Sequence, residues 1–142
     1  MSKLQNNKIL NLLLLKLIQE KLHIFSYMLC YEKSKKKQMN IFALSTGKGP
    51  SGIAILRLSG KDSLQISKLI TKKNDLKSKE VNLCKFYDPS NGKMIDEGLL
   101  LWSPAPNSYT GEDLAEFHTH GSNAVVSCFL RVLGEQENCR LA

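Results

Sequence analysis

Three chemically versatile residues alternate along one short segment, in the pattern Glu116-x-His118-x-His120. In a β-strand, residues two apart lie on the same face of the sheet. One carboxylate and two imidazoles on one face are ligand types that bind zinc or iron. No fourth ligand is evident from the spacing, however. The pattern therefore favours a polar strand that satisfies neighbouring loops over a metal centre.

A single charged residue, Arg57, interrupts the apolar segment Ile53–Leu58. A buried guanidinium is costly unless it is paired, so we expect it to contact a carboxylate or a ligand anion. The alternative is an edge strand from which Arg57 reaches solvent. Glu116 has apolar neighbours, and a carboxylate accepts two parallel hydrogen bonds from a 2-aminopyrimidinone edge. Arg57 and Glu116 therefore pair either with each other or with a bound heterocycle, and periodicity does not distinguish the two.

Glycines at positions 47, 49 and 52 match the GxGxxG pattern of dinucleotide-binding loops. Such a loop leads from a strand into a helix, whose N-terminus holds the phosphates. Here it leads into Ile53–Leu58, which has the composition of a strand, so a structural turn is favoured. The sequence contains no P-loop pattern and no GxSxG nucleophile elbow, so neither chemistry is predicted.

The elements that must position these residues follow from apolar spacing and turn residues. Period-two and short apolar runs predict strands, and i, i+3, i+4 spacing predicts amphipathic helices. The resulting order, β-α-β-β-β-α, predicts an α+β fold on one mixed sheet with flanking helices. The predicted segments are a short apolar run at Ile41–Leu44, strands at Ile53–Leu58, Val81–Tyr87 and Leu114–His120, one or two strands in Met94–Asp96 and Gly98–Trp102, and helices at Ser63–Thr71 and Ala124–Leu133.

Composition bounds the chain to one domain with a tail. Its 142 residues are 42% hydrophobic and 23% charged, an ordinary globular balance. The net charge is +7, but residues 1–40 hold eight lysines and two glutamates, and residues 41–142 hold 12 basic and 11 acidic residues. Residues 41–142, here called the body, are therefore nearly neutral, which argues against a basic nucleic-acid-binding face. Four cysteines without a CxxC pattern are typical of reduced thiols.

Residues 1–40 form a leader rich in Leu and Lys, without Gly or Pro. Its apolar stretch is too short and too charged to span a bilayer, so no membrane insertion is expected. A helix is plausible, since Leu, Lys, Gln and Glu favour one. Three interpretations remain open: a poorly ordered extension or upstream translated sequence, an organelle-targeting segment, and a secretory signal. The first is favoured, and the lack of a small-residue cleavage site argues against the third.

Four segments, in order, resemble one known family. They read IFALST from Ile41, GIAILRLSG from Gly52, PAPNSYTGED from Pro104 and EFHTHG from Glu116. Together they are similar to the N-terminal domain of the tRNA modification GTPases TrmE, also called MnmE, and especially to the mitochondrial form. The resemblance covers residues 41–142 and implies mitochondrial localisation, with the cytoplasm as the alternative.

The resemblance implies a fold like the tetrahydrofolate-binding domain of TrmE and of aminomethyltransferase. It also implies binding of 5-formyl- or methylene-tetrahydrofolate as a one-carbon donor, and homodimerisation. Matched motif to motif, the folate-contacting positions fall on Arg57 and Glu116. Full family members also carry a helical domain and a G domain, which uses GTP, Mg²⁺ and K⁺. They act with a flavoprotein, MnmG or GidA, on the wobble uridine of tRNA.

Departures from the family pattern lead to a second hypothesis. Pro50, Ala54 and Ser122 replace an Arg and two Gly that are common in the family, which is expected to loosen the loop near the ligand. The later family segments and the G domain have no counterpart before Ala142. We therefore expect a C-terminally incomplete domain that does not hydrolyse GTP alone and is marginally stable. The alternative function is a truncated, non-catalytic dimerisation or interaction module without folate binding.

Overall fold

The computed structural model describes residues 16–22, 38–47 and 49–142. Contacts divide the chain into two units, residues 1–37 and 38–142. In the first unit residues 16–22 are helical, in keeping with the helix-favouring composition of the leader. The other interpretations of the leader concern residues outside the described ranges. Among the described residues, no helix has the length and apolar character needed to cross a membrane.

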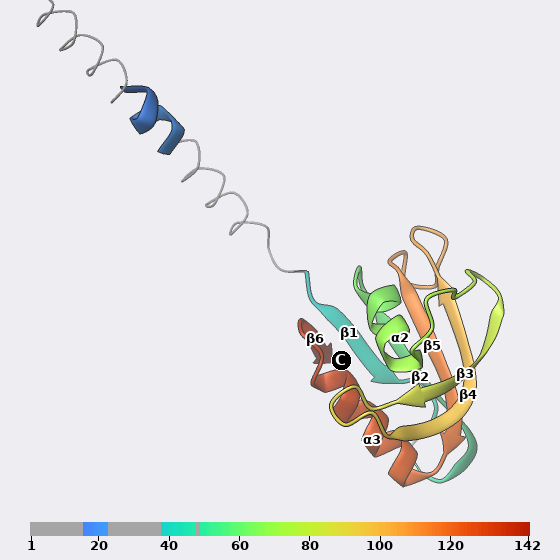
Figure 1. Ribbon diagram of the computed structural model, residues 1–142. Helices are drawn as coiled ribbons and strands as arrows, with labels where there is room; N and C mark the ends of the chain where they lie inside the picture. The colour runs from blue at the N-terminus through green and yellow to red at the C-terminus, as the bar shows by residue number, and fades with distance from the viewer. Residues whose placement is uncertain (1–15, 23–37, 48) are drawn as a thin grey trace, which may run out of the picture. The chain divides into compact units, whose positions relative to one another are not determined.

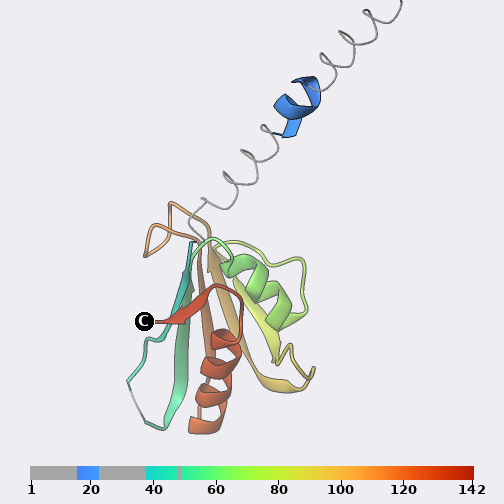
Figure 2. The same ribbon diagram turned by 90° about the vertical axis from the view of Figure 1, so that its left-hand side faces the viewer.

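The second unit is a six-stranded sheet with two helices on one of its faces (Figures 1 and 2). The strands lie in the order β3-β4-β5-β2-β1-β6, and all neighbours are antiparallel except β1 and β6. The predicted α+β fold on one mixed sheet is confirmed. Its elements are β1 (Asn40–Leu44), β2 (Ser51–Ser59), α2 (Ser63–Thr71), β3 (Val81–Tyr87), β4 (Met94–Ser103), β5 (Leu114–Gly121), α3 (Asn123–Gly134) and β6 (Cys139–Leu141).

The core lies between the helices and one face of the sheet. Along β2, Ala54, Leu56 and Leu58 are buried and alternate with more exposed residues, as a strand covered on one side requires. Phe86 from β3, Phe117 from β5 and Phe129 from α3 meet with ring centroids 5.2–5.8 Å apart. The aromatic contacts therefore join β3 and β5 to α3.

The opposite face of the sheet, here called the open face, has no helix of the described unit over it (Figure 2). Arg57 and Glu116 lie on it, next to each other in the β2–β5 register. Large apolar side chains on the same face are solvent-exposed, with 62% of Ile53, 67% of Val81 and 61% of Leu83 accessible. The open face thus carries exposed apolar side chains on β2 and β3 beside the charged pair at its centre.

Two buried or capping polar groups fix the ends of the helices. The Ser122 hydroxyl accepts a hydrogen bond from the amide of Val125 at 3.3 Å and caps α3. Asp62 occupies the N-cap position of α2, but its side chain makes no cap bond. It accepts instead from the fully buried Asn40 at 3.0 Å. That bond ties β1 to the start of α2.

Of the one or two strands predicted in Met94–Asp96 and Gly98–Trp102, the structure has one, β4, in which Gly98 stands where a Cβ atom would clash with the carbonyl of His118. Two other elements differ from the prediction. Strand β2 begins at Ser51, two residues earlier than predicted. The short strand β6 was not predicted. The described cysteines, Cys84, Cys128 and Cys139, are free thiols.

Candidate functional site

The two residues singled out in the sequence meet at the centre of the open face. The Nε–H of Arg57 donates a hydrogen bond of 2.7 Å to Oε1 of Glu116. The guanidinium side chain is 38% exposed and the carboxylate side chain 17%. The edge-strand interpretation of Arg57 is wrong, since β2 lies between β5 and β1. A half-buried charge on an interior strand requires a partner, and Glu116 is that partner.

An exposed aromatic ring completes this cluster. Tyr109, in the loop between β4 and β5, places its ring centroid 5.0 Å from Cζ of Arg57. A guanidinium over an aromatic face at this distance is a cation–π contact. Tyr109 nevertheless remains 84% exposed. A planar ring with one free face therefore stands directly beside the ion pair.

Hydrogen bonds on both sides of Tyr109 anchor its loop. The hydroxyls of Ser59 and Thr110 lie 2.8 Å apart, and the Ser59 hydroxyl also donates to Glu112 at 3.0 Å. The Ser108 hydroxyl donates to the backbone carbonyl of Glu112. Because both neighbours of Tyr109 are held in this way, the position of the exposed ring follows from its loop and not from its own packing.

A hollow of about 340 Å³ adjoins the cluster, between β1, β2 and the anchored loop. Its size falls within the range of small-molecule sites. The lining is apolar along β1 and polar along the loop, so it suits a flat ligand with a few hydrogen-bonding groups. The residues around it are Ile41, Phe42, Ala43, Ser45, Arg57, Ser59, Thr110, Glu112 and Leu114.

Sequence reasoning located Arg57 and Glu116 but missed Tyr109, Ser59 and Glu112 as parts of the same cluster. A signal was present for each of them. Tyr109 and Glu112 stand in the Pro- and Gly-bounded segment from Pro104 to Asp113, where a large aromatic residue is unusual for a turn. Ser59 follows Arg57 by two residues and so lies on the same face of β2. Their contacts join segments that the sequence separates by 50 residues or more. A local pattern can therefore mark each residue as unusual, but it does not show that the residues meet.

The alternating Glu and His residues do not form a metal site. Glu116 is engaged by Arg57, whereas Nδ1 of His120 lies 2.8 Å from Oδ1 of Asp96. The Asp96 carboxylate also accepts from the backbone amide of His120 at 2.7 Å. His118 lines a separate hollow of about 200 Å³. Within the part of the chain that the structure describes, no three His, Cys, Asp or Glu residues are arranged to hold a metal ion.

The glycine-rich segment is a turn between two antiparallel strands. It joins β1 to β2, and Gly49 adopts a φ of 113°, which favours glycine. No helix begins after it, so the helix N-terminus that a dinucleotide loop uses to hold phosphate is missing here. The structural turn predicted from the sequence is therefore the observed role.

Two of the three departures from the family pattern lie away from the cluster. Ala54 is 2% exposed and faces the helices, not the open face. Ser122 caps α3 through its hydroxyl. The expectation that these two changes loosen the loop near the ligand is wrong, because one packs in the core and the other stabilises a helix end. Only Pro50 lies in the turn itself, where it is exposed.

Comparisons with known proteins identify the family of the chain. The family described as GTP-binding protein TrmE N-terminus matches residues 40–142. A tRNA modification GTPase MnmE of Pelagibacter ubique is 49% identical over 104 residues, covering 73% of this chain and 24% of the relative. The mitochondrial tRNA modification GTPase of Dictyostelium discoideum is 40% identical over 106 residues, covering 70% of this chain and 21% of the relative.

A human relative adds a second mitochondrial member. It is the mitochondrial 5-taurinomethyluridine tRNA synthase subunit, 45% identical over 103 residues, covering 72% of this chain and 21% of the relative. The chain thus spans about a quarter or less of the length of these relatives. The match covers the whole second unit apart from its first two residues. The chain belongs to the TrmE N-terminus family, the N-terminal domain of the MnmE-type tRNA modification GTPases.

Proposed function

We propose that residues 38–142 bind a reduced folate, 5-formyl- or methylene-tetrahydrofolate, on the open face of the sheet. The observation that carries this proposal is the Arg57–Glu116 pair, held 2.7 Å apart beneath the exposed ring of Tyr109. A carboxylate, a guanidinium and a free aromatic face together match a flat heterocycle with an amino-carbonyl edge. The adjoining hollow offers room for part of such a ligand.

Each residue has a distinct role in this proposal. Glu116 accepts two parallel hydrogen bonds from the 2-amino-4-oxo edge of the pteridine, and Arg57 moves aside to the ligand's carbonyl or carboxylate oxygens. The ring of Tyr109 covers one face of the heterocycle. The Arg57–Glu116 pair contributes about 1 kcal/mol or less, because its guanidinium is partly exposed. Exchange of partners at Glu116 is therefore energetically accessible. The folate itself supplies a one-carbon unit.

The same face suits a second copy of the chain. Ile53, Val81 and Leu99 expose between 40% and 67% of their surface there, which is unusual for an isolated domain. We propose that a homodimer covers these side chains. Analytical ultracentrifugation measures this directly: a dimer that Ile53→Lys converts to monomer supports the assignment, and a monomer at every concentration contradicts it.

The wider role follows from the relatives' names. We propose that the chain acts in mitochondria as part of a tRNA wobble-uridine modification GTPase. A G domain that uses GTP, Mg²⁺ and K⁺, a flavoprotein of the MnmG or GidA type, and tRNA are the further components. Two relatives are named as mitochondrial and all are named for tRNA modification or synthesis.

One observation favours the alternative function, a non-catalytic dimerisation module without folate. Arg57 and Glu116 already satisfy each other, so the site is stable without a ligand. Calorimetric titration of 5-formyl-tetrahydrofolate into the intact chain separates the two functions. Saturable binding with one ligand per chain supports the folate site. A folded, soluble chain that gives no binding heat at several temperatures supports the interaction module.

A further inference from the structure

The near neutrality of the body conceals a separation of charge along the chain. Residues 61–93 contain eight lysines and four carboxylates, a net charge of +4. Residues 94–142 contain two arginines and seven carboxylates, a net charge of −5. The net charge of residues 41–142 as a whole does not reveal this separation. The fold keeps much of the positive charge together, around the end of α2 and the edge strand β3.

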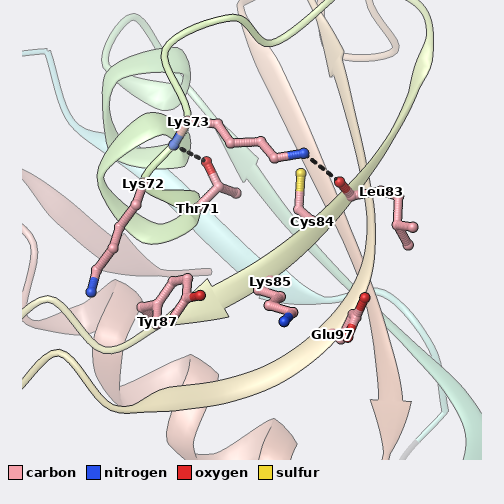
Figure 3. Close-up of a pocket in the computed structure, with 8 residues that line it drawn as sticks. All are labelled: Thr71, Lys72, Lys73, Leu83, Cys84, Lys85, Tyr87 and Glu97. Atoms are coloured by element: carbon pink, nitrogen blue, oxygen red, sulfur yellow. Dashed lines mark hydrogen bonds between the residues drawn. The ribbon is translucent and has the colours of Figure 1, made fainter.

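A hollow of about 390 Å³ lies between the end of α2 and β3, and we call it the α2–β3 groove (Figure 3). Three lysines line it, with one carboxylate from β4. Figure 3 shows Lys72 extending from the helix end towards Tyr87, Lys73 crossing from the helix end to Leu83, and Lys85 on the strand itself. The lining residues are Thr71, Lys72, Lys73, Leu83, Cys84, Lys85, Tyr87 and Glu97.

Two of the three ammonium groups are held in place. Nζ of Lys73 donates a hydrogen bond of 2.7 Å to the carbonyl of Leu83. Nζ of Lys72 lies 4.2 Å from the ring centroid of Tyr87. Lys72 itself has a left-handed backbone, with φ of 55°, at the C-cap of α2. The groove therefore presents positioned cations, which cost less side-chain entropy on binding than free surface lysines.

Among the described residues, no carboxylate oxygen lies within 4.0 Å of the ammonium groups of Lys72, Lys73 or Lys85. In the described part of the chain, the one lysine ion pair within 4.0 Å is that of Lys77 with Glu80, at 3.4 Å. Glu97 stands opposite Lys85 in the β3–β4 register and offsets part of the charge. Three ammonium groups against one carboxylate leave the groove with a net charge of +2. Such a site favours a partner that brings several negative charges.

We propose that the α2–β3 groove binds the phosphate backbone of RNA. Cations along an edge strand with an aromatic ring beside them are the features that hold nucleic-acid backbone and bases. A single phosphate ion would contact the lysines but would leave most of the groove empty. The proposal rests on the proposed role in tRNA modification for its choice of RNA, but it uses a surface separate from the Arg57–Glu116 cluster.

Salt dependence of RNA binding tests the groove. An unmodified tRNA transcript is titrated with the intact chain by fluorescence anisotropy between 50 and 200 mM KCl. Each neutralised phosphate contributes about 0.7–0.9 to the slope of log K against log salt. If all three lysines contact phosphates, the K72Q/K73Q/K85Q variant loses about 2–3 from that slope. Over this range its affinity then falls about 20- to 40-fold less than that of the wild type.

The leader supplies a control with the same change of charge, K35Q/K36Q/K37Q. The groove assignment requires this control to retain a steeper slope than the groove variant. Equal slopes for the groove variant and the wild type overturn the proposal, and so does an equal loss in the leader control. The proposal is also overturned if 10 mM inorganic phosphate or phosphatidylserine vesicles displace the labelled tRNA as effectively as unlabelled tRNA does.

Folding and folate binding are controlled separately. Because Lys73→Gln removes a hydrogen bond, the double variant K72Q/K85Q is measured beside the triple, and K72R/K73R/K85R is expected to restore the slope. Thermal melting establishes that each variant folds. Groove variants that lose RNA but keep 5-formyl-tetrahydrofolate leave both proposals standing. RNA binding through the groove by a wild type that binds no folate refutes the folate proposal alone.

Discussion

Replacing Glu116 with Gln separates ligand binding from folding at the candidate site. The substitution keeps the shape of the side chain but replaces one acceptor oxygen with a donor. A hydrogen bond to a charged group is worth about 1.5–3 kcal/mol, and this carboxylate is only 17% exposed, so little of that is screened. We expect Glu116→Gln to weaken binding of 5-formyl-tetrahydrofolate by about 10- to 150-fold.

The same variant is expected to fold nearly as well as the wild type. Its Arg57 partner is 38% exposed, so the ion pair contributes about 1 kcal/mol or less. For a domain of this size that corresponds to a drop in Tm of no more than about 4–8 °C. Calorimetric titration measures the affinity, and scanning calorimetry of the same samples measures Tm.

A charge-matched control completes this experiment. Glu80 is exposed and pairs only loosely with Lys77, at 3.4 Å, so Glu80→Gln should bind folate like the wild type. An unchanged affinity in Glu116→Gln refutes the assignment of the ligand edge to Glu116. A loss of affinity that the Glu80 variant shares refutes it equally, because the effect is then one of net charge.

Three further predictions concern the loop, the buried amide and the β3–β4 turn. Tyr109→Ala should weaken folate binding about 2- to 13-fold and Tyr109→Phe hardly at all, since a stacked ring is worth about 0.5–1.5 kcal/mol; equal affinities for Ala and Phe argue against stacking. Asn40→Ala should cost about 2–4 kcal/mol in urea unfolding, because the fully buried Asn40 side chain accepts from the amide of Asp62 and donates to its carboxylate, and both groups lose that partner; a loss below 1 kcal/mol contradicts that role. Hydrogen bonds from Ser90 and Arg131 hold the pKa of Asp88 well below its usual range. Asp88→Asn should therefore be less stable than the wild type at pH 7, and the difference should shrink below about pH 4, where the unfolded carboxylate is protonated; a pH-independent difference excludes this linkage.

Local pattern was sufficient for the elements that carry the site. The spacing of Leu64, Ile66, Leu69 and Ile70 predicted the observed bounds of α2, although only Ile66 and Ile70 of these are buried against the sheet. Alternation in Leu114–His120 likewise placed Glu116 on one face of a strand. Both the helix and the face of the strand could be predicted from the sequence, because each depends on residues within a few positions of one another.

Features that depend on contacts between distant residues could not be predicted from the sequence. Strand β6 has three residues and exists through parallel pairing with β1, about 100 residues earlier. Whether β2 is an edge or an interior strand is likewise set by β1 and β5, so the sequence left the partner of Arg57 open. The α2–β3 groove escaped notice for a related reason, since a summed charge says nothing of where the fold places Lys72 and Lys85.

The exchange of partners at Glu116 is the central claim, and the Nε–H proton of Arg57 reports on it directly. In ¹⁵N-labelled protein the 2.7 Å bond to Glu116 should give this group a distinct, slowly exchanging NMR signal. On addition of 5-formyl-tetrahydrofolate we expect the signal to shift or broaden in proportion to site occupancy, and to be altered already in ligand-free Glu116→Gln. A signal that stays unchanged while the protein saturates with folate contradicts the claim, because the ligand then binds without displacing Arg57 from Glu116.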